Sequence, residues 1–515
     1  MRKGLSVLLL AAAVVAAACG SGGDSEAKLS KREPPVVVLL IMDEFPTDAL
    51  YGANGKIDAA RFPNFAALAR MGTWFPNSTS VYDSTPKAVP LILDGRRPYK
   101  GETADTRTHS HSLYTALGRR GYRISDSEEA TAVCPRRYCP GAPTRRPAII
   151  PNLVRGRAVR FTRWLHTIRP LRRPGLWVKH ALIPHQPWIY LPSGKQMRPV
   201  VTDPVPAMAS PPGFYDAFLT DHNRQRQLLQ IGFADRELGR LLRRLRRKRM
   251  LDRALLVITA DHGYEWKVGV PQRRQVFRRN IDELGPQPLF VKAPRQRRGR
   301  IDRSYVRTLD VTPTIADVLD VPLGYRTDGH SAFSRVTRRR RIVAMPKRDF
   351  SFVVRISARN MERRRAVNRR RWRQLFGTGA DSVRRYGDPW ASVYRIGPHQ
   401  DLLGRRVAEL RAASQGQLSA EIAHPESTRA VNASAHLRPT QIGGFVRGGA
   451  SDARRDVAVA VNGRIEAVGR SFHLRDKPGE GFAVMVPEKA IRPGRNDVRV
   501  YSVGTGERLT LLGHN

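Results

Sequence analysis

Residues 35–45 read PVVVLLIMDEF, an apolar run that leads into Asp43 and Glu44. A run that is hydrophobic at every position is typical of a strand buried on both faces of a parallel sheet. Residues 254–263, ALLVITADHG, repeat this plan and end in Asp-His-Gly. Ligands of open α/β sheets bind beyond the carboxyl ends of the strands. The two runs therefore predict the centre of a sheet and a ligand site at one edge of it.

Further strand and helix patterns alternate around these two runs. Strands are expected within 174–187 and 288–294, and helices within 62–72, 214–250 and 309–321. Thr312 is the expected N-terminal cap of the last helix, with a proline following it in the first turn. Strands that alternate with helices predict an α/β fold, with a mostly parallel sheet and helices on both faces.

The chain has 515 residues, which is more than one ordinary core accommodates. After residue 430, short alternating runs with Asn462-Gly463 between two of them predict a small antiparallel β domain, a sandwich. The expected organisation is a signal peptide at 1–19, a flexible tether at 20–34, the α/β domain at 35–345, an Arg-rich connecting region at 346–430 and the β domain at 431–515.

The N-terminus has a basic start, an apolar run from Leu5 to Ala18 and then Cys19. This is the plan of a secretory signal peptide. A cysteine directly after small residues resembles the cleavage site of bacterial lipoproteins, in which Cys19 becomes the lipidated first residue. The N-terminus therefore predicts an exported protein, lipid-anchored on the outer face of the bacterial cell membrane or held in the periplasm.

The formal net charge is +45, from 90 Lys and Arg residues against 45 Asp and Glu residues. Such a surface attracts anions, for example phosphate polymers and anionic lipid headgroups. Zinc-finger spacing and the aromatic signature of RNA-binding modules are both missing, so specific nucleic-acid binding is not expected. The expected partner is an anionic substrate of the cell envelope. Nothing in the sequence indicates the oligomeric state.

Cys134 and Cys139 stand close together in CPRRYC. Two nearby cysteines in an exported protein most simply form a disulfide that closes a small loop. A metal site would need further ligands near them, and the neighbouring sequence supplies none. The pattern therefore favours a Cys134–Cys139 disulfide.

A third stretch, STPKAVPLILDGR at 84–96, places Ser84 and Thr85 before a proline and an apolar run. Taken alone, this is a common helix N-terminus. Carboxylates and imidazoles at strand ends are ligands for a divalent cation, and a hydroxyl beside such a cation becomes a strong nucleophile. The strand-end groups are Asp43-Glu44 and Asp261-His262, so the three stretches together predict metal-assisted chemistry.

In type and chain order, these three motifs resemble the sulfatase-like branch of the alkaline phosphatase superfamily, which also includes lipoteichoic acid synthases. Two later stretches, FVKAP at 290–294 and RTLDVTPTIADVLDVPLGYRTDGHS at 307–331, resemble the closing part of the same domain. The resemblance covers residues 35–335. It implies an alkaline phosphatase-like catalytic domain.

The resemblance also implies roles for individual residues. Asp43, Asp261 and His262 would hold a divalent metal (Mn, Zn, Mg or Ca), with Thr85 as the fourth ligand and the nucleophile. Glu44 would be a fifth ligand or would orient the ligands from outside. One metal site is implied, and a second is not clearly marked. His185, in a Pro-His-x-Pro turn, and Lys87 would bind the substrate, whereas His180 inside its strand is expected to be buried packing.

The family pattern leaves two candidates for the nucleophile. The spacing to Gly95 points to Thr85, whereas the Cys-x-Pro pattern of sulfatases points to Ser84. Sulfatases convert a Cys or Ser to formylglycine, and the stretch contains no Cys. The expected activity is therefore that of an exported metal-dependent hydrolase or transferase acting on phosphate esters through a covalent Thr85 intermediate. Sulfate esters with Ser84 as nucleophile are one alternative, and a non-catalytic binder of envelope polymers is another.

Overall fold

The computed structural model describes residues 34–197, 216–269, 275–413, 416–449, 454–474 and 477–514. The expected signal peptide, with Cys19, and nearly all of the tether lie outside the described residues. Among the helices that are described, none has the length and apolarity needed to cross a bilayer.

Within the described residues, the α/β domain is built on a seven-stranded sheet with the order β3-β4-β1-β5-β6-β2-β7. Its strands are β1 (Val36–Met42), β2 (Thr73–Trp74), β3 (Arg123–Ser127), β4 (Gly175–Ala181), β5 (Ala254–Ala260), β6 (Leu289–Lys292) and β7 (Arg300–Ile301). The four strands β3, β4, β1 and β5 are parallel, and β6 runs antiparallel to both of its neighbours. The expected α/β class is confirmed, with one reversed strand in a mixed sheet.

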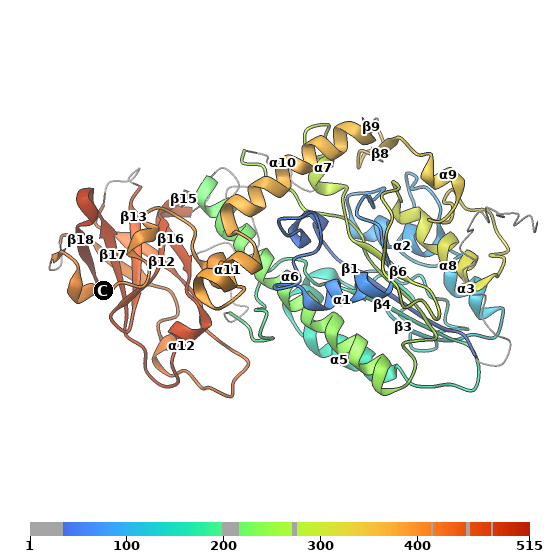
Figure 1. The fold of residues 1–515 in the computed structure, drawn as a ribbon, viewed down its shortest axis with the longest axis horizontal. Coiled ribbons are helices and arrows are strands. Elements are labelled where there is room, and N and C mark those ends of the chain that lie inside the picture. The colour runs from blue at the N-terminus through green and yellow to red at the C-terminus, as the bar shows by residue number, and fades with distance from the viewer. Residues whose placement is uncertain are drawn as a thin grey trace, which may run out of the picture.

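Helices cover both faces of this sheet (Figure 1). They are α1 (Pro63–Met71), α2 (Thr85–Asp94), α3 (Leu113–Gly118), α4 (Ile149–Val154), α5 (Arg157–Thr167), α6 (Ala217–Arg247), α7 (Ile281–Leu284), α8 (Val311–Leu319) and α9 (Arg335–Arg338). Alternate residues of β1 face opposite cores. Val38 and Leu40 pack with α1, α5 and α6, whereas Leu39 and Ile41 pack with α2, α3 and α8. This double burial is why the β1 sequence is apolar throughout.

One helix start differs from the expectation. The residue that precedes α8 is Asp310, so Thr312 lies inside the first turn and does not cap the helix. Its hydroxyl donates instead to the carbonyl oxygens of Ile92 at 2.8 Å and Leu93 at 3.1 Å. Thr312 therefore ties α8 to the C-terminal end of α2.

The expected connecting region contains regular structure. A hairpin of β8 (Ile342–Pro346) and β9 (Val353–Ser357) is followed by α10 (Ala358–Phe376) and α11 (Gly379–Tyr386). The helix α10 packs on the α/β domain through Trp372 and Phe376, which belong to the same core as α1 and α6. The many arginines of α10 made the helix look solvent-exposed in the sequence. Arginine can nevertheless pack its apolar stem against a surface while its charged end reaches a polar partner.

Arg365 fixes α10 to the α/β domain. Its guanidinium is fully buried and lies 2.8 Å from the Asp48 carboxylate. It also donates to Pro76 O at 2.9 Å and to Asn77 Oδ1 at 3.1 Å. Removing one partner of a buried ion pair leaves the other charge without compensation.

We expect Arg365→Met to lower the free energy of unfolding by about 3–5 kcal/mol, because Asp48 would lose its closest cation. Urea unfolding followed by circular dichroism measures this change. Arg370→Met is the matched control, because Arg370 is exposed on the same helix. Equal effects of the two substitutions would show that Arg365 does not anchor α10.

The C-terminal domain holds nine strands among the described residues. They are β10 (Ala412–Ala413), β11 (Ser419–Ile422), β12 (Gln441–Arg447), β13 (Asp456–Val461), β14 (Arg464–Arg470), β15 (Phe472–Leu474), β16 (Lys477–Met485), β17 (Val498–Val503) and β18 (Leu509–His514), with the short helix α12 (Glu426–Arg429). Most neighbours are antiparallel, but β10 and β11 run parallel to β18. β18 pairs with β17 on one side and with β11 on the other, so the two halves form one continuous sheet. Its strands contribute to a larger and a smaller apolar cluster. Asn462 and Gly463 form the expected hairpin turn, with φ of 51° and 80°.

The long helix α6 connects the two domains (Figure 1). Most of its buried side chains belong to the core beneath the α/β sheet. At its N-terminal end, Leu219 packs with Phe472, Leu474 and Ala483 of the β domain. The same helix therefore contributes to the cores of both domains.

Candidate active site

The candidate site lies at the carboxyl edge of the parallel strands. Asp43 follows β1 and Asp261 follows β5, as expected, and His180 is the next-to-last residue of β4. The Asp43 amide donates to Ile183 O at 3.1 Å, and the Asp261 amide donates to Met42 O at 3.0 Å. These bonds extend the strand pairing by one residue and bring the side chains together.

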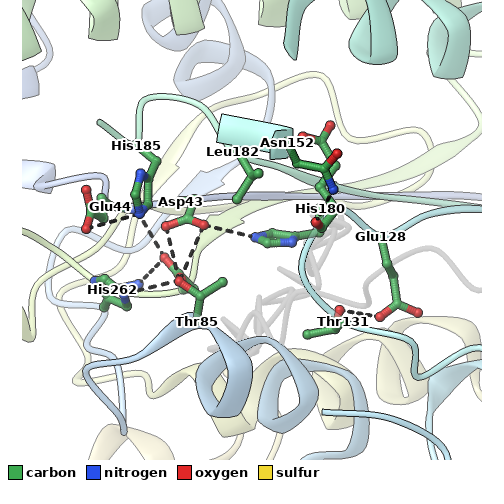
Figure 2. Close-up of polar contacts among 12 residues, drawn as sticks. Asp43, Glu44, Thr85, Glu128, Thr131, Asn152, His180, Leu182, His185 and His262 are labelled. Carbon is green, nitrogen blue, oxygen red and sulfur yellow. Dashed lines mark hydrogen bonds and ion pairs between the residues drawn. The ribbon is translucent and has the colours of Figure 1, made fainter. Parts of the chain in front are cut away.

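Asp43, His180 and Asp261 form a compact group of side chains that could bind a metal. Figure 2 shows the His180 ring directed toward the Asp43 carboxylate. All three are buried, and one donor atom from each lies within 4.8 Å of the others. Within the part of the chain that the structure describes, three buried atoms of this group have no hydrogen-bond partner, namely Nδ1 and Nε2 of His180 and Oδ2 of Asp261. Buried polar atoms without a hydrogen-bond partner are rare in folded proteins. Two carboxylates and an imidazole are suitable ligands for a divalent cation, so these residues fit a metal ion.

His180 is buried, as expected, but it also belongs to this candidate metal-binding group, which was not predicted from the sequence. Its Nε2 lies 3.4 Å from Asp43 Oδ2, and burial lowers the pKa of His180 to about 4. The ring is therefore neutral near pH 7, which is the form that ligates a metal. In the β1–β4 register His180 pairs with Ile41, which faces α2. The sequence does carry one sign of this role, because Lys179 and His180 are two ionisable residues inside an otherwise apolar strand.

Thr85 is the first residue of α2, with Pro86 beside it in the first turn. The Thr85 hydroxyl lies 3.4 Å from both carboxylate oxygens of Asp43 (Figure 2). Ser84 is the residue before the helix, and its side chain makes no capping hydrogen bond. Of the two candidate nucleophiles, Thr85 is therefore the one that contacts the metal-binding group.

Asp261 and His262 stand together at the end of β5. Asp261 Oδ1 accepts from Glu44 N at 3.1 Å and from His262 N at 2.6 Å. His262 Nδ1 donates to Gly263 O at 2.8 Å, so Nε2, 3.4 Å from Asp261 Oδ2, carries the lone pair. A Cβ at Gly263 would lie 2.2 Å from Glu283 O, so this close turn needs a glycine.

Glu44 turns away from this group toward the segment that carries His185. Its Oε1 lies 3.4 Å from His185 Nε2 (Figure 2). Its Oε2 accepts from Gln186 N at 3.4 Å. His185 Nδ1 lies 2.5 Å from Gln186 O and donates to it. The Nδ1 bond orients the ring so that Nε2 faces the Glu44 carboxylate.

Two buried side chains hold the backbone around His185. Arg157 donates to Leu182 O at 3.1 Å, His185 O at 2.6 Å and Pro187 O at 2.5 Å. Gln230 on α6 donates to Pro184 O at 2.9 Å and His185 O at 2.7 Å. Its Oε1 accepts from the amides of residues 189 and 190 at 2.8 and 3.1 Å. The position of His185 is therefore fixed from two helices, α5 and α6.

Lys87 lies in the first turn of α2, in the wall of a cavity of about 600 Å³ that includes Ser84. Its ammonium donates to Tyr99 O at 2.9 Å and pairs with Glu102 at 3.3 Å. The cysteines Cys134 and Cys139 form a disulfide within the core on the α2 side of the sheet.

The model of the sulfatase family matches residues 35–321, which is more than half of the 515 residues. The chain belongs to the sulfatase family. This confirms the resemblance to the alkaline phosphatase superfamily that the motifs indicated. Sulfatase-family membership supports an ester hydrolase, and the Asp43–His180–Asp261 group is consistent with metal dependence.

One curated protein and two solved structures are among those similar to this chain. Human N-sulphoglucosamine sulphohydrolase is 32% identical over 99 residues, which are 19% of this chain and 18% of that protein. The chain thus matches less than a fifth of the length of this curated relative. The phosphonate monoester hydrolase SpPMH from Silicibacter pomeroyi is 17% identical with a TM-score of 0.43, over 61% of this chain and 79% of that chain. A protein solved with its substrate D-glucosamine-2-N,6-O-disulfate is 13% identical with a TM-score of 0.46, over 69% and 98% of the two chains.

Proposed function

We propose that this chain is an exported, metal-dependent ester hydrolase or transferase, in which Thr85 attacks a phosphate ester of an anionic envelope substrate. One observation carries the proposal: the Thr85 hydroxyl lies 3.4 Å from Asp43, inside a buried group of metal-binding residues. Family membership supports ester chemistry. The signal-like N-terminus, with Cys19, supports export and lipid anchoring, and the net charge of +45 supports an anionic substrate.

Asp43, His180 and Asp261 would hold the cation, with His262 beside Asp261. A divalent cation, when bound, stabilises an alkoxide and offsets the charge of a phosphoryl or sulfuryl group. The Thr85 hydroxyl donates to Asp43 at 3.4 Å, and as the nucleophile it would attack the ester in line with the leaving alcohol. Its oxygen would form the new bond to phosphorus while the bond to the leaving alcohol breaks.

His185 is the candidate proton donor for the leaving alcohol. In its protonated form, His185 would pass the Nε2 proton, which faces Glu44 at 3.4 Å, to the departing oxygen. Water would then hydrolyse the Thr85 ester and regenerate the hydroxyl. An acceptor alcohol in place of water would make the same chemistry a transferase.

Sulfate ester hydrolysis is the second candidate, with Ser84 as the nucleophile. The observations that favour it are the family model and the position of Ser84 in the wall of the 600 Å³ cavity. This reading requires conversion of Ser84 to formylglycine. The mass of the peptide that contains Ser84 distinguishes the converted from the unconverted residue.

The test uses the chain from residue 20 onward, stripped of metal and reloaded with Mn²⁺, Zn²⁺ or Mg²⁺. An aryl phosphate monoester, a phosphate diester and a sulfate ester are assayed side by side, and bound metal is counted by mass spectrometry. We expect stoichiometric metal and metal-dependent phosphate ester turnover. Absence of both turnover and stoichiometric metal would overturn the proposal in favour of a non-catalytic binding protein.

We expect Gln230→Met to lower kcat by roughly 10–100-fold, because a shift of about 1 Å in a positioned group can cost this much. Gln230 makes all its described contacts with the His185 segment. Steady-state kinetics on the metal-loaded chain measures the change.

Gln225→Met is the matched control for this positioning role. Gln225 is also a buried glutamine of α6, but it donates to Val393 O at 2.7 Å, away from His185. If both variants lose activity in proportion to their loss of thermal stability, the positioning role of Gln230 is ruled out.

A further inference from the structure

The cavity of about 600 Å³ beside the nucleophile is lined on one side by Ser84 and Pro86, the two residues that flank Thr85. Its remaining wall carries five cationic side chains, namely Lys87, Arg107, Arg145, Arg146 and Arg348. Thr85 itself does not line the cavity, and we take the side formed by Ser84 and Pro86 as the one from which a substrate would reach it. The charge of the five cationic side chains therefore bears on which substrate fits.

Three of the five cations already have an anionic partner. Lys87 pairs with Glu102 at 3.3 Å, Arg107 with Asp105 at 2.8 Å and Arg348 with Asp83 at 2.9 Å. These pairs leave little net charge in their part of the wall. They also fix the wall, since the Arg348–Asp83 contact ties the β8–β9 hairpin to the residues before α2.

Arg145 and Arg146 differ from the other three. Both are exposed, and neither has an ion pair or side-chain hydrogen bond with any other described residue. They lie in the short segment between Ala142 and the start of α4, and both of its ends are held by the fold. Ala142 is buried in the same core as the Cys134–Cys139 disulfide, and α4 begins at Ile149. The segment is thus held at both ends while its two guanidinium groups remain available to a ligand.

We propose that Arg145 and Arg146 form a second anion subsite, which binds an anionic group of the substrate other than the ester that Thr85 attacks. The substrate class is then an ester that carries at least two phosphate, sulfate or carboxylate groups. Guanidinium groups bind such oxyanions in bidentate geometry, and two adjacent ones add charge as well as direction. This inference rests on the proposed function, because it takes the Thr85 side of the cavity as the place of the scissile ester.

The test compares two sugar phosphates that differ by one phosphate group, glucose 6-phosphate and glucose 1,6-bisphosphate. Binding to the Mn²⁺-loaded Thr85→Ala chain is measured by calorimetry at about 0.15 M salt, where exposed charges more than ~8 Å apart are largely screened. We expect the bisphosphate to bind about 10–100-fold more tightly, in line with 1.4 kcal/mol per tenfold change. The additional double substitution Arg145→Gln/Arg146→Gln should remove this preference and leave the affinity for glucose 6-phosphate within about twofold.

A matched control separates a local subsite from the general positive charge. Arg163→Gln/Arg169→Gln removes the same charge from exposed positions that do not line the cavity, and should keep the preference. The subsite is overturned if the Arg145/Arg146 variant keeps the preference both for the sugar bisphosphate and in the lipid comparison below, or if the control loses it equally. A lipid arm compares vesicles of cardiolipin and phosphatidylglycerol at equal phosphate content. A preference that only the Arg145/Arg146 variant loses there would place the second anion in a lipid headgroup.

Turnover assays of the unsubstituted chain distinguish failure of the subsite proposal from failure of the proposed function. Ester turnover without any effect of Arg145 and Arg146 in either arm would overturn the subsite and leave the proposed function intact. Absence of turnover, together with a bisphosphate preference that depends on the two arginines, would overturn the hydrolase and support the subsite as part of an anion-binding protein.

Discussion

Thr85→Ala is expected to lower kcat by ~10³-fold or more, because it removes the nucleophile and not merely a contact to the substrate. The Thr85 hydroxyl lies 3.4 Å from both carboxylate oxygens of Asp43, and alanine removes this group. Alanine is a good helix former, so α2 should keep its first turn. The measurement is steady-state turnover of the metal-loaded variant, with metal content determined on the same sample.

Ser84→Ala is the matched control, because it deletes a hydroxyl one residue away. Its side chain makes no capping hydrogen bond, so we expect activity within a few-fold of the unsubstituted chain. The reverse pattern, with activity lost in Ser84→Ala and kept in Thr85→Ala, would move the nucleophile by one residue and favour the sulfate ester reading.

Asp261→Asn is expected to weaken metal binding by at least about 100-fold, since it removes a carboxylate from the group that holds the cation. The asparagine oxygen can still accept from Glu44 N and His262 N, so the strand end should keep its shape. Metal titration by calorimetry gives the affinity directly. A thermal shift gives a second readout, because a bound metal at about 1,000 times its Kd stabilises the fold by about 4 kcal/mol.

Asp235→Asn is the control for loss of a buried carboxylate. Asp235 accepts from Asn64 and Phe65 on the α1 side of the sheet, away from the metal-binding group. We expect it to leave metal affinity unchanged. Equal metal binding by Asp261→Asn and the unsubstituted chain would show that Asp261 does not ligate the cation.

The strand runs and the residues directly after them could be predicted from sequence for a physical reason. A strand buried on both faces must be apolar throughout, so the polar residues that follow β1 and β5 mark the strand ends, and parallel strands end at the same edge. The helix start was marked by Pro86 and the apolar run, whereas Thr85 was chosen as the nucleophile from its spacing to Gly95 in the pattern of the family that the motifs resemble. These signals are local, and each can be seen within about ten residues.

The remaining parts of the site depend on contacts between distant residues. His180 enters the metal-binding group because the register of β4 against β1 places it on the face of α2, and a single strand does not reveal that phase. The cavity wall includes Arg348, which reaches Asp83 across 265 positions of sequence. The packing of α10 was concealed for a related reason. Arg365 is charged in the sequence and buried in the fold, and its partner Asp48 lies 317 positions away.

The covalent step itself can be observed by acid-quenching the metal-loaded chain during turnover of a phosphate diester and mapping the modified peptide by mass spectrometry. A phosphoryl group on Thr85, absent without metal and absent in Thr85→Ala, is the expected result. A group on Ser84, a formylglycine at Ser84, or turnover with no modified peptide at any quench time would each rule out Thr85 as the nucleophile.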